Sequence, residues 1–215
     1  MPRLALFDLD NTLVDRRAAF VVSVSGMCEA AGYGPEIEAW MVHELADRAG
    51  LQDFARLREA FALEEPAAQL WQTYMDRMAA AVTCRPAVLE GLAQLRSEGW
   101  TIGVATNGAP DIQRAKLTAA GISALVHGVA VSGDIEARKP DIRLFELTAA
   151  RCGTSLSEGG WMTGDQPVGD IEGGRQAGLS TIWLRRQQWP DDLAPPDHTV
   201  DDVSDAITFL LTETE

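Results

Sequence analysis

Short apolar runs alternate with amphipathic stretches along most of this 215-residue chain, and this alternation constrains the fold more than any other feature. The apolar runs predict buried strands over 4–7, 101–106, 126–132, 161–163 and 180–184. Helical periodicity predicts helices over 86–98, 110–120, 140–151, 167–177 and 202–211. Strands separated by helices of this length are typical of βαβ units, so we expect an α/β fold built on a parallel sheet.

One interval, residues 16–83, interrupts this rhythm because it contains no run typical of a strand. Apolar residues recur there at helical spacing, and Gly and Pro divide the pattern. We therefore expect four helices inserted between the first strand and the rest of the sheet. The expected division is an α/β core domain of residues 1–15 and 84–215 and a helical domain of residues 16–83. The Pro- and Asp-rich segment 185–199 is predicted to be a surface loop.

Composition limits the classes of function. Hydrophobic residues make up 46% of the chain, which excludes disorder over most of its length. The 18 Lys and Arg residues against 32 Asp and Glu residues give a net charge of −14, which argues against nucleic-acid or anionic-membrane partners. No apolar run approaches a membrane span, and the N-terminal run is too short for a signal-peptide core. Cys28, Cys84 and Cys152 form no disulfide or zinc motif, so we expect buried thiols in a reducing cytoplasm.

Two aspartates, Asp8 and Asp10, follow the first predicted strand. Side chains two positions apart in an extended chain point the same way, so both carboxylates can face one pocket. One of them can attack an electrophile while the other moves a proton. An Asp-rich turn is the alternative, although the position directly after an apolar run favours a site.

Further polar residues follow later strands or precede a helix. Thr106 ends a predicted strand and Asn107 follows it, and together they offer a hydroxyl and backbone N–H groups to phosphoryl oxygens. Lys139 precedes a predicted helix, whose N-terminus would stabilise an anion. Asp165 and Asp170 lie in a Gly-containing turn, and such paired carboxylates suit Mg²⁺. Taken singly, these residues have simpler explanations: a turn, a surface lysine and a helix cap.

Taken together, four segments carry a resemblance that covers nearly the whole chain: DLDNTLVD at 8–15, TNG at 106–108, RKP at 138–140 and GDQPVGD at 164–170. In this order, they resemble the motifs of the haloacid dehalogenase superfamily, in its phosphatase-like majority. The resemblance implies a Rossmann-like, doubly wound parallel sheet, and the helical insertion is similar to that family's C1-type cap. The segment NGAPDIQRAK is similar to members that act on nucleotide or sugar-acid monophosphates.

The resemblance implies roles for the residues around the reaction. Asp8 corresponds to the nucleophile that forms an aspartyl-phosphate. Asp10 corresponds to the general acid and base, which protonates the leaving alcohol and then activates water. Thr106 and Lys139 correspond to residues that hold the transferred phosphoryl oxygens, with help from the Asn107 backbone.

The resemblance also implies a Mg²⁺ site. Its ligands would be the Asp8 side chain, the Asp10 backbone carbonyl and Asp165, with Asp170 supporting the metal directly or through water. Three clustered carboxylates need a cation, and a phosphate monoester is itself nearly a dianion at neutral pH. Many relatives have Ser where this chain has Gln166, which we expect to change local hydrogen bonding only.

The implied function is that of a Mg²⁺-dependent phosphatase, a phosphoric monoester hydrolase, acting on a small phosphorylated metabolite of the nucleotide or sugar monophosphate class. A phosphomutase would use the same chemistry. A dehalogenase is disfavoured because such members lack the carboxylate of Asp10 and need no metal. A non-catalytic binding protein on this fold would be expected to lose some of these residues.

The helical cap is expected to set specificity by closing over the site. Its candidate contacts are Arg17, Trp40, His43, Arg48, Trp71 and Tyr74, although the last two have the spacing of a helix interior. We expect a monomer or homodimer with no nucleic-acid or membrane partner.

Overall fold

The structure, a computed structural model, describes residues 3–213, so residues 1–2 and 214–215 of the expected core domain lie outside the described residues. Within that range, parallel strands form one sheet in the order β3-β2-β1-β4-β5-β6. The strands are β1 (Arg3–Phe7), β2 (Trp100–Thr106), β3 (Gly128–Val131), β4 (Trp161–Gly164), β5 (Ser180–Leu184) and β6 (His198–Val200). The chain proceeds outward from the central β1 in both directions, which is a Rossmann-like, doubly wound order. The predicted α/β fold is therefore confirmed.

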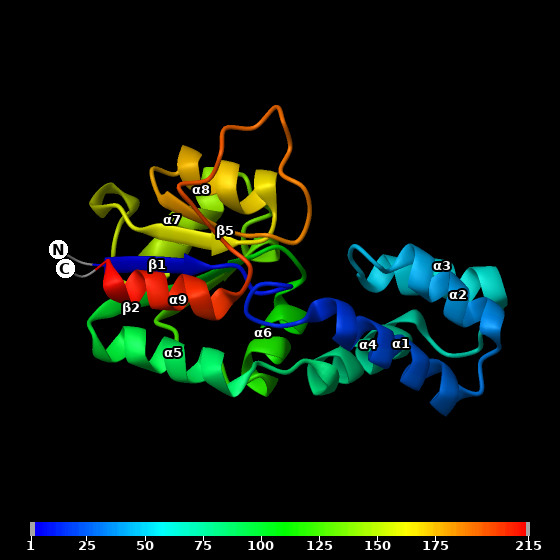
Figure 1. Ribbon diagram of the computed structural model, residues 1–215. Coiled ribbons are helices and arrows are strands. Elements are labelled where there is room, and N and C mark those ends of the chain that lie inside the picture. The colour runs from blue at the N-terminus through cyan, green and yellow to red at the C-terminus, as the bar shows by residue number, and fades with distance from the viewer. Residues whose placement is uncertain (1–2, 214–215) are drawn as a thin grey trace.

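The two faces of β1 bury different side chains because side chains alternate along a strand. Leu4 and Leu6 pack on one face with Phe145, whereas Ala5 and Phe7 belong to the apolar cluster on the other face. The first face is covered by α7 (Ile142–Arg151) and α8 (Gly173–Gln176), and the second by α5 (Pro86–Ser97) and α9 (Val203–Thr212). Figure 1 shows these helices above and below the sheet.

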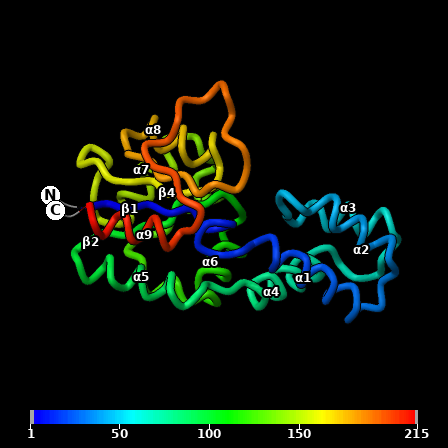
Figure 2. The backbone as a smooth tube through the Cα atoms, viewed as in Figure 1, coloured from blue at the N-terminus to red at the C-terminus, as the bar shows by residue number. Residues whose placement is uncertain are grey.

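Four helices occupy the interval between β1 and α5, as expected. They are α1 (Arg16–Ala31), α2 (Pro35–Glu44), α3 (Leu51–Phe61) and α4 (Ala67–Ala81). They lie beyond the carboxyl end of β1, to the right of the sheet in Figure 1. The tube in Figure 2 leaves the sheet after β1 and returns before α5, so this helical layer is one continuous insertion.

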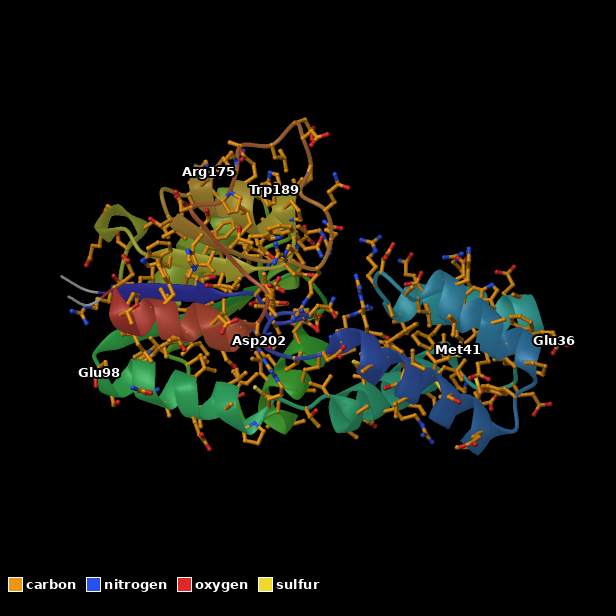
Figure 3. The ribbon with its side chains drawn as sticks, in the orientation of Figure 1. Glu36, Met41, Glu98, Arg175, Trp189 and Asp202 are labelled. Atoms are coloured by element: carbon orange, nitrogen blue, oxygen red, sulfur yellow. The ribbon has the colours of Figure 1, made fainter. Side chains whose placement is uncertain are left out.

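The inserted helices pack on one another, and their buried residues continue the apolar cluster that contains Ala5 and Phe7. Met41 of α2 lies between α2 and α1 (Figure 3), with its sulfur 3.9 Å from that of Cys28. Phe54, Trp71 and Tyr74 form an aromatic cluster whose ring centroids lie 5.2 to 5.8 Å apart. Trp71 and Tyr74 are therefore packed within these helices, as their spacing indicates.

One strand was not predicted. β6 lies at the end of the segment predicted to be a surface loop, where it pairs with β5. Asp197 aligns the two strands, because its Oδ2 accepts hydrogen bonds from the N and Oγ1 of Thr181, both at 2.8 Å. A strand of three residues after a Pro-rich segment gives too little alternation to be recognised in the sequence.

The helix after Lys139 begins later than predicted. α7 begins at Ile142, because the Asp141 side chain accepts a hydrogen bond from the backbone N of Arg143 at 3.0 Å and caps the helix there. Lys139 thus lies in a loop rather than directly at a helix N-terminus, which corrects the prediction for 140–151.

The segment after β4 also differs from its prediction. The expected helix over 167–177 begins as a π-helical segment, η3 (Pro167–Glu172), and continues as the short α8. β3 is shorter than predicted because the 3₁₀ segment η1 (Ser132–Asp134) follows it. α5, α9 and α6 (Pro110–Ala119) agree with their predictions within one residue at each end. Among the helices of residues 3–213, none is both long enough and apolar enough for a membrane span.

Candidate functional site

Three predicted site residues meet where three neighbouring strands end. Asp8 directly follows β1, Thr106 is the last residue of β2, and Asp165 directly follows β4. β1 pairs with both β2 and β4, so their carboxyl ends form one edge. This edge includes the point where the doubly wound order reverses, which is where open α/β sheets bind their ligands.

Lys139 links two of the aspartates at this edge. Its Nζ donates to Asp8 Oδ1 at 2.5 Å and to the backbone O of Ala105 at 2.7 Å, and lies 2.7 Å from Asp170 Oδ1. The Lys139 side chain is only 3% exposed. Although burial lowers the pKa of Lys139, Asp170 and Asp8 hold it above its ordinary value, so this ammonium stays charged.

Asn107 holds the loop that carries Lys139. Its Oδ1 accepts from the backbone N of Lys139 at 2.9 Å, and its Nδ2 donates to the backbone O of Lys139 at 3.3 Å. The Asn107 side chain therefore positions the lysine, so the role that the resemblance implies would fall to the Asn107 backbone N–H.

Asp10 faces a different set of partners. Lys116 Nζ donates to its two carboxylate oxygens at 2.9 and 3.0 Å, and Gln113 Nε2 donates to Oδ2 at 3.1 Å. Arg16 Nε lies 4.0 Å from the same oxygen. Burial lowers the pKa of Lys116, while the charge of Asp10 opposes this shift. The Asp10 carboxylate is thus separate from the acidic cluster described below.

Gln113 connects Asp10 to Thr106. Its Nε2 also donates to Thr106 Oγ1 at 2.6 Å, and its Oε1 accepts from Lys116 Nζ at 2.9 Å. Because a lysine only donates, this contact fixes the orientation of the amide. The Thr106 hydroxyl accepts from Gln113 and keeps its own proton for another acceptor. Gly108 makes room for this amide, since a Cβ there would lie 2.8 Å from Gln113 Cγ.

Gln113 and Lys116 are the site residues that sequence reasoning missed. They lie within the quoted segment NGAPDIQRAK but received no role. The available signal was their spacing: residues three apart on α6 share a face, and both are almost fully buried.

Three carboxylates form an acidic cluster. One oxygen from each of Asp8, Asp165 and Asp170 lies within 4.8 Å of the others. Gly164 allows this approach, because a Cβ there would lie 2.1 Å from Asp170 Oδ2. Burial raises the pKa of Asp8 to about 8 and Asp170 adds to the shift, while Lys139 opposes it. Burial and then Asp170 raise the pKa of Asp165 to about 6.

The cluster fits a divalent cation. Asp165 Oδ1 is buried and has no hydrogen-bond partner among the described residues, while Gln166 Nε2 donates to Oδ2 at 3.0 Å. An all-oxygen donor set suits Mg²⁺. Burial, and after it the charge of Asp170, keeps the pKa of both Asp8 and Asp165 raised although Lys139 lowers it, so a bound cation would stabilise these carboxylates in their charged form.

A cavity of about 1020 Å³ separates the sheet edge from the inserted helices. Of the six cap residues named from the sequence, Arg17, Arg48 and Tyr74 line it. Trp40 and Trp71 do not, and the His43 side chain is 85% exposed beside Glu44. These three residues therefore lie outside the cavity wall in this structure.

Comparison with known proteins places the chain in a family. The family described as haloacid dehalogenase-like hydrolase matches residues 5–184, so the chain belongs to that family and is a hydrolase. A phosphoserine phosphatase from Thermus thermophilus is 39% identical over 52% of this chain and 45% of its own length. The match thus spans less than half of that relative.

Two further comparisons cover more of the chain. The pyrimidine 5′-nucleotidase PynA from Streptococcus pneumoniae is 29% identical over 84% of this chain and 83% of its own length. The magnesium-bound HAD hydrolase YfnB from Bacillus subtilis has a TM-score of 0.73 at 21% identity, covering 97% of this chain and 98% of its own. At that identity, the structural likeness shows the fold alone.

Proposed function

We propose that this protein is a Mg²⁺-dependent phosphatase that hydrolyses a small phosphorylated metabolite through a phosphoryl group carried on Asp8. The observation that supports this most strongly is the buried Asp8 carboxylate, 2.5 Å from Lys139 and two residues before Asp10. Relatives named as pyrimidine 5′-nucleotidase and glyceraldehyde 3-phosphate phosphatase are compatible with a nucleotide or sugar monophosphate as substrate.

In the first step, an Asp8 oxygen attacks phosphorus, and the bond from phosphorus to the leaving oxygen breaks. Asp10, in its protonated form, gives its proton to that oxygen, so a neutral alcohol departs. Lys139 and the Thr106 hydroxyl donate to the transferred phosphoryl oxygens, and the Asn107 backbone assists. Fixed donors of this kind stabilise charge as it develops.

In the second step, water attacks phosphorus while Asp10 accepts its proton. The bond between phosphorus and Asp8 breaks, which releases phosphate and restores the carboxylate. Lys116 and Gln113 hold Asp10 in one orientation through both steps, as their hydrogen bonds to it suggest.

In this proposal, Asp8, the backbone carbonyl of Asp10 and Asp165 hold Mg²⁺, with Asp170 acting directly or through water. When bound, the ion offsets the negative charge of the carboxylates and of the phosphoryl group, so that nucleophile and substrate can approach.

We also propose that residues 16–83 form a C1-type cap on a core domain of residues 1–15 and 84–215. The single insertion point after β1 and the interior around Phe54 support this division. The three cysteine thiols are free, which is compatible with an enzyme of the reducing cytoplasm. A monomer or a homodimer fits the proposal equally well.

Asp10 favours a phosphatase over a dehalogenase, because carbon–halogen cleavage has no leaving oxygen to protonate. A phosphomutase would return the phosphoryl group to substrate instead of passing it to water. The test is hydrolysis of an aryl phosphate with Mg²⁺ in heavy-oxygen water. The proposal predicts that the label enters phosphate and not the alcohol. Label in the alcohol, or no phosphate release from any ester, would contradict it.

A further inference from the structure

Three arginines from different parts of the chain line the cavity beside the Asp8–Lys139 pair. Arg17 lies in the first turn of α1, Arg48 in the connection between α2 and α3, and Arg138 directly before Lys139. Two therefore come from the inserted helices and one from the sheet domain.

None of these arginines is paired with a carboxylate of the described residues, although the charge of Arg17 acts on Asp165 and opposes the rise in its pKa. Among residues 3–213, the side chains of Arg17, Arg48 and Arg138 make no hydrogen bond or ion pair. The other cations of the cavity wall are engaged: Lys139 with Asp8, and Lys116 and Arg16 with Asp10.

Most carboxylates that line the cavity are engaged by other groups, so the positive charge of these three guanidinium groups is not balanced there. Asp53 accepts from Arg56 at 3.3 Å and from the backbone N of Gly50 at 2.9 Å. Asp165 belongs to the acidic cluster, so the exposed Asp47 is the one remaining carboxylate among the described residues of the wall.

Two of the arginines also influence each other across the cavity. Burial lowers the pKa of Arg138, and the charge of Arg48 lowers it further. Like charges thus gather from both sides of the cavity in a chain whose net charge is −14. Such an arrangement is favourable when an anion enters between the two sides.

We propose that Arg17, Arg48 and Arg138 form a subsite for a second anionic group, a carboxylate or a second phosphate, on the leaving-group side of the substrate. The guanidinium fork matches both groups by paired hydrogen bonds. This inference rests on the proposed phosphatase function. Among small phosphorylated metabolites, it favours phosphate monoesters of hydroxy acids, or bisphosphates, over nucleoside monophosphates and neutral sugar monophosphates.

Three esters of one three-carbon skeleton test the subsite. They are the monophosphate of 1,3-propanediol, its bisphosphate, and the phosphate ester of 3-hydroxypropanoate. The wild-type protein should show a kcat/KM at least about tenfold higher for one of the two doubly anionic esters, as expected of charge-assisted hydrogen bonds. Which of them is preferred distinguishes carboxylate from phosphate.

The Arg48→Gln/Arg138→Gln double variant tests whether these side chains cause the preference. In this variant, kcat/KM for the preferred doubly anionic ester divided by kcat/KM for propanediol monophosphate should fall to near one. Arg58→Gln is the matched control, because Arg58 is an exposed arginine of α3 outside the cavity wall. Its ratio should remain that of the wild type. Because each ratio is internal to one protein, partial misfolding of a variant does not alter it.

The outcomes separate this inference from the proposed function. Hydrolysis of an aryl phosphate and of all three esters without preference would overturn the subsite and leave the phosphatase intact. A preference that persists in the double variant would also overturn it. If the wild type hydrolyses no phosphate ester at all, the proposed function fails and this inference fails with it.

Discussion

Lys116 Nζ lies 2.9 and 3.0 Å from the two carboxylate oxygens of Asp10, and the Lys116 side chain is only 3% exposed. The sequence contains two lysines, and the other, Lys139, is paired with Asp8. Two aspartates of one short motif are thus bound to two different cations. This separation matches the different tasks that we propose for them.

Replacing Lys116 with Met should remove the ammonium while keeping most of the side-chain volume. Because Asp10 then loses its main partner, we expect kcat for an alkyl phosphate to fall by about tenfold or more, within the range typical of general acid–base catalysis. An aryl phosphate with a good leaving group should lose less, since its leaving oxygen needs little protonation. Steady-state kinetics with both esters measures this difference.

Arg114→Met is the control for that variant, because Arg114 lies on the exposed side of α6 and pairs with Asp134. It should change neither rate by more than a small factor. Equal losses for both esters in the Lys116 variant would show that Lys116 supports the fold rather than Asp10.

Gly164→Ala should displace Asp170. The new Cβ would lie 2.1 Å from Asp170 Oδ2, so the carboxylate must move away from Lys139. Overpacking of this kind costs about 1–3 kcal/mol of unfolding free energy. We expect the activation free energy of the reaction to rise by more than the unfolding free energy falls. Gly169→Ala should be milder, since its Cβ would meet atoms only at 3.5 Å and beyond. Denaturant unfolding and kinetics on both variants measure these effects, and similar activities would contradict the account.

Chelation should abolish activity, and added Mg²⁺ should restore it. The acidic cluster has one lysine for three carboxylates, so a cation is needed to bring a dianionic phosphate to Asp8. Asp165→Asn should raise the Mg²⁺ concentration required for half-maximal rate, because one anionic ligand becomes neutral. A titration of rate against Mg²⁺ shows the shift. Full activity in metal-free buffer would refute the metal assignment.

Phe54→Ala tests the proposed cap. The Phe54 ring is fully buried between Trp71 and Tyr74, at 5.6 and 5.2 Å, and its truncation should cost about 3–5 kcal/mol locally. If residues 16–83 form a separate domain, amide exchange should accelerate there and stay slow in β1 and β2. Leu92→Ala in α5 should give the reverse pattern. Uniform acceleration across the chain in both variants would argue for one cooperative domain.

Much of the fold is predictable from local pattern. The alternation of apolar runs predicts five of the strands because each is buried and flanked by an amphipathic helix. β6 is not predicted because its position depends on the hydrogen bonds between Asp197 and Thr181, which no local sequence pattern reveals. The start of α7 depends on the Asp141 cap for a similar reason.

The same distinction applies to the site: local pattern predicts some of its residues, and others depend on tertiary packing. Residues at strand ends, such as Asp8 and Thr106, are recognisable because topology alone brings strand ends together. Gln113 and Lys116 lie in a helix, where burial of polar side chains depends on what packs against them. Arg138 belongs to the quoted segment RKP but received no role, and only the cavity shows that it lies near Arg48.

The central claim is that Asp8 carries the phosphoryl group. Rapid-quench mass spectrometry on the peptide containing Asp8 tests it most directly, in the wild type and in Asp10→Asn. Without its general base, the Asp10 variant should accumulate the adduct because hydrolysis slows more than phosphoryl transfer to Asp8 from an aryl phosphate. The account predicts one phosphoryl group on Asp8 in that variant and none in Asp8→Asn, whose turnover should be lost by orders of magnitude. Near wild-type turnover in Asp8→Asn, or a phosphoryl group on another residue, would contradict it.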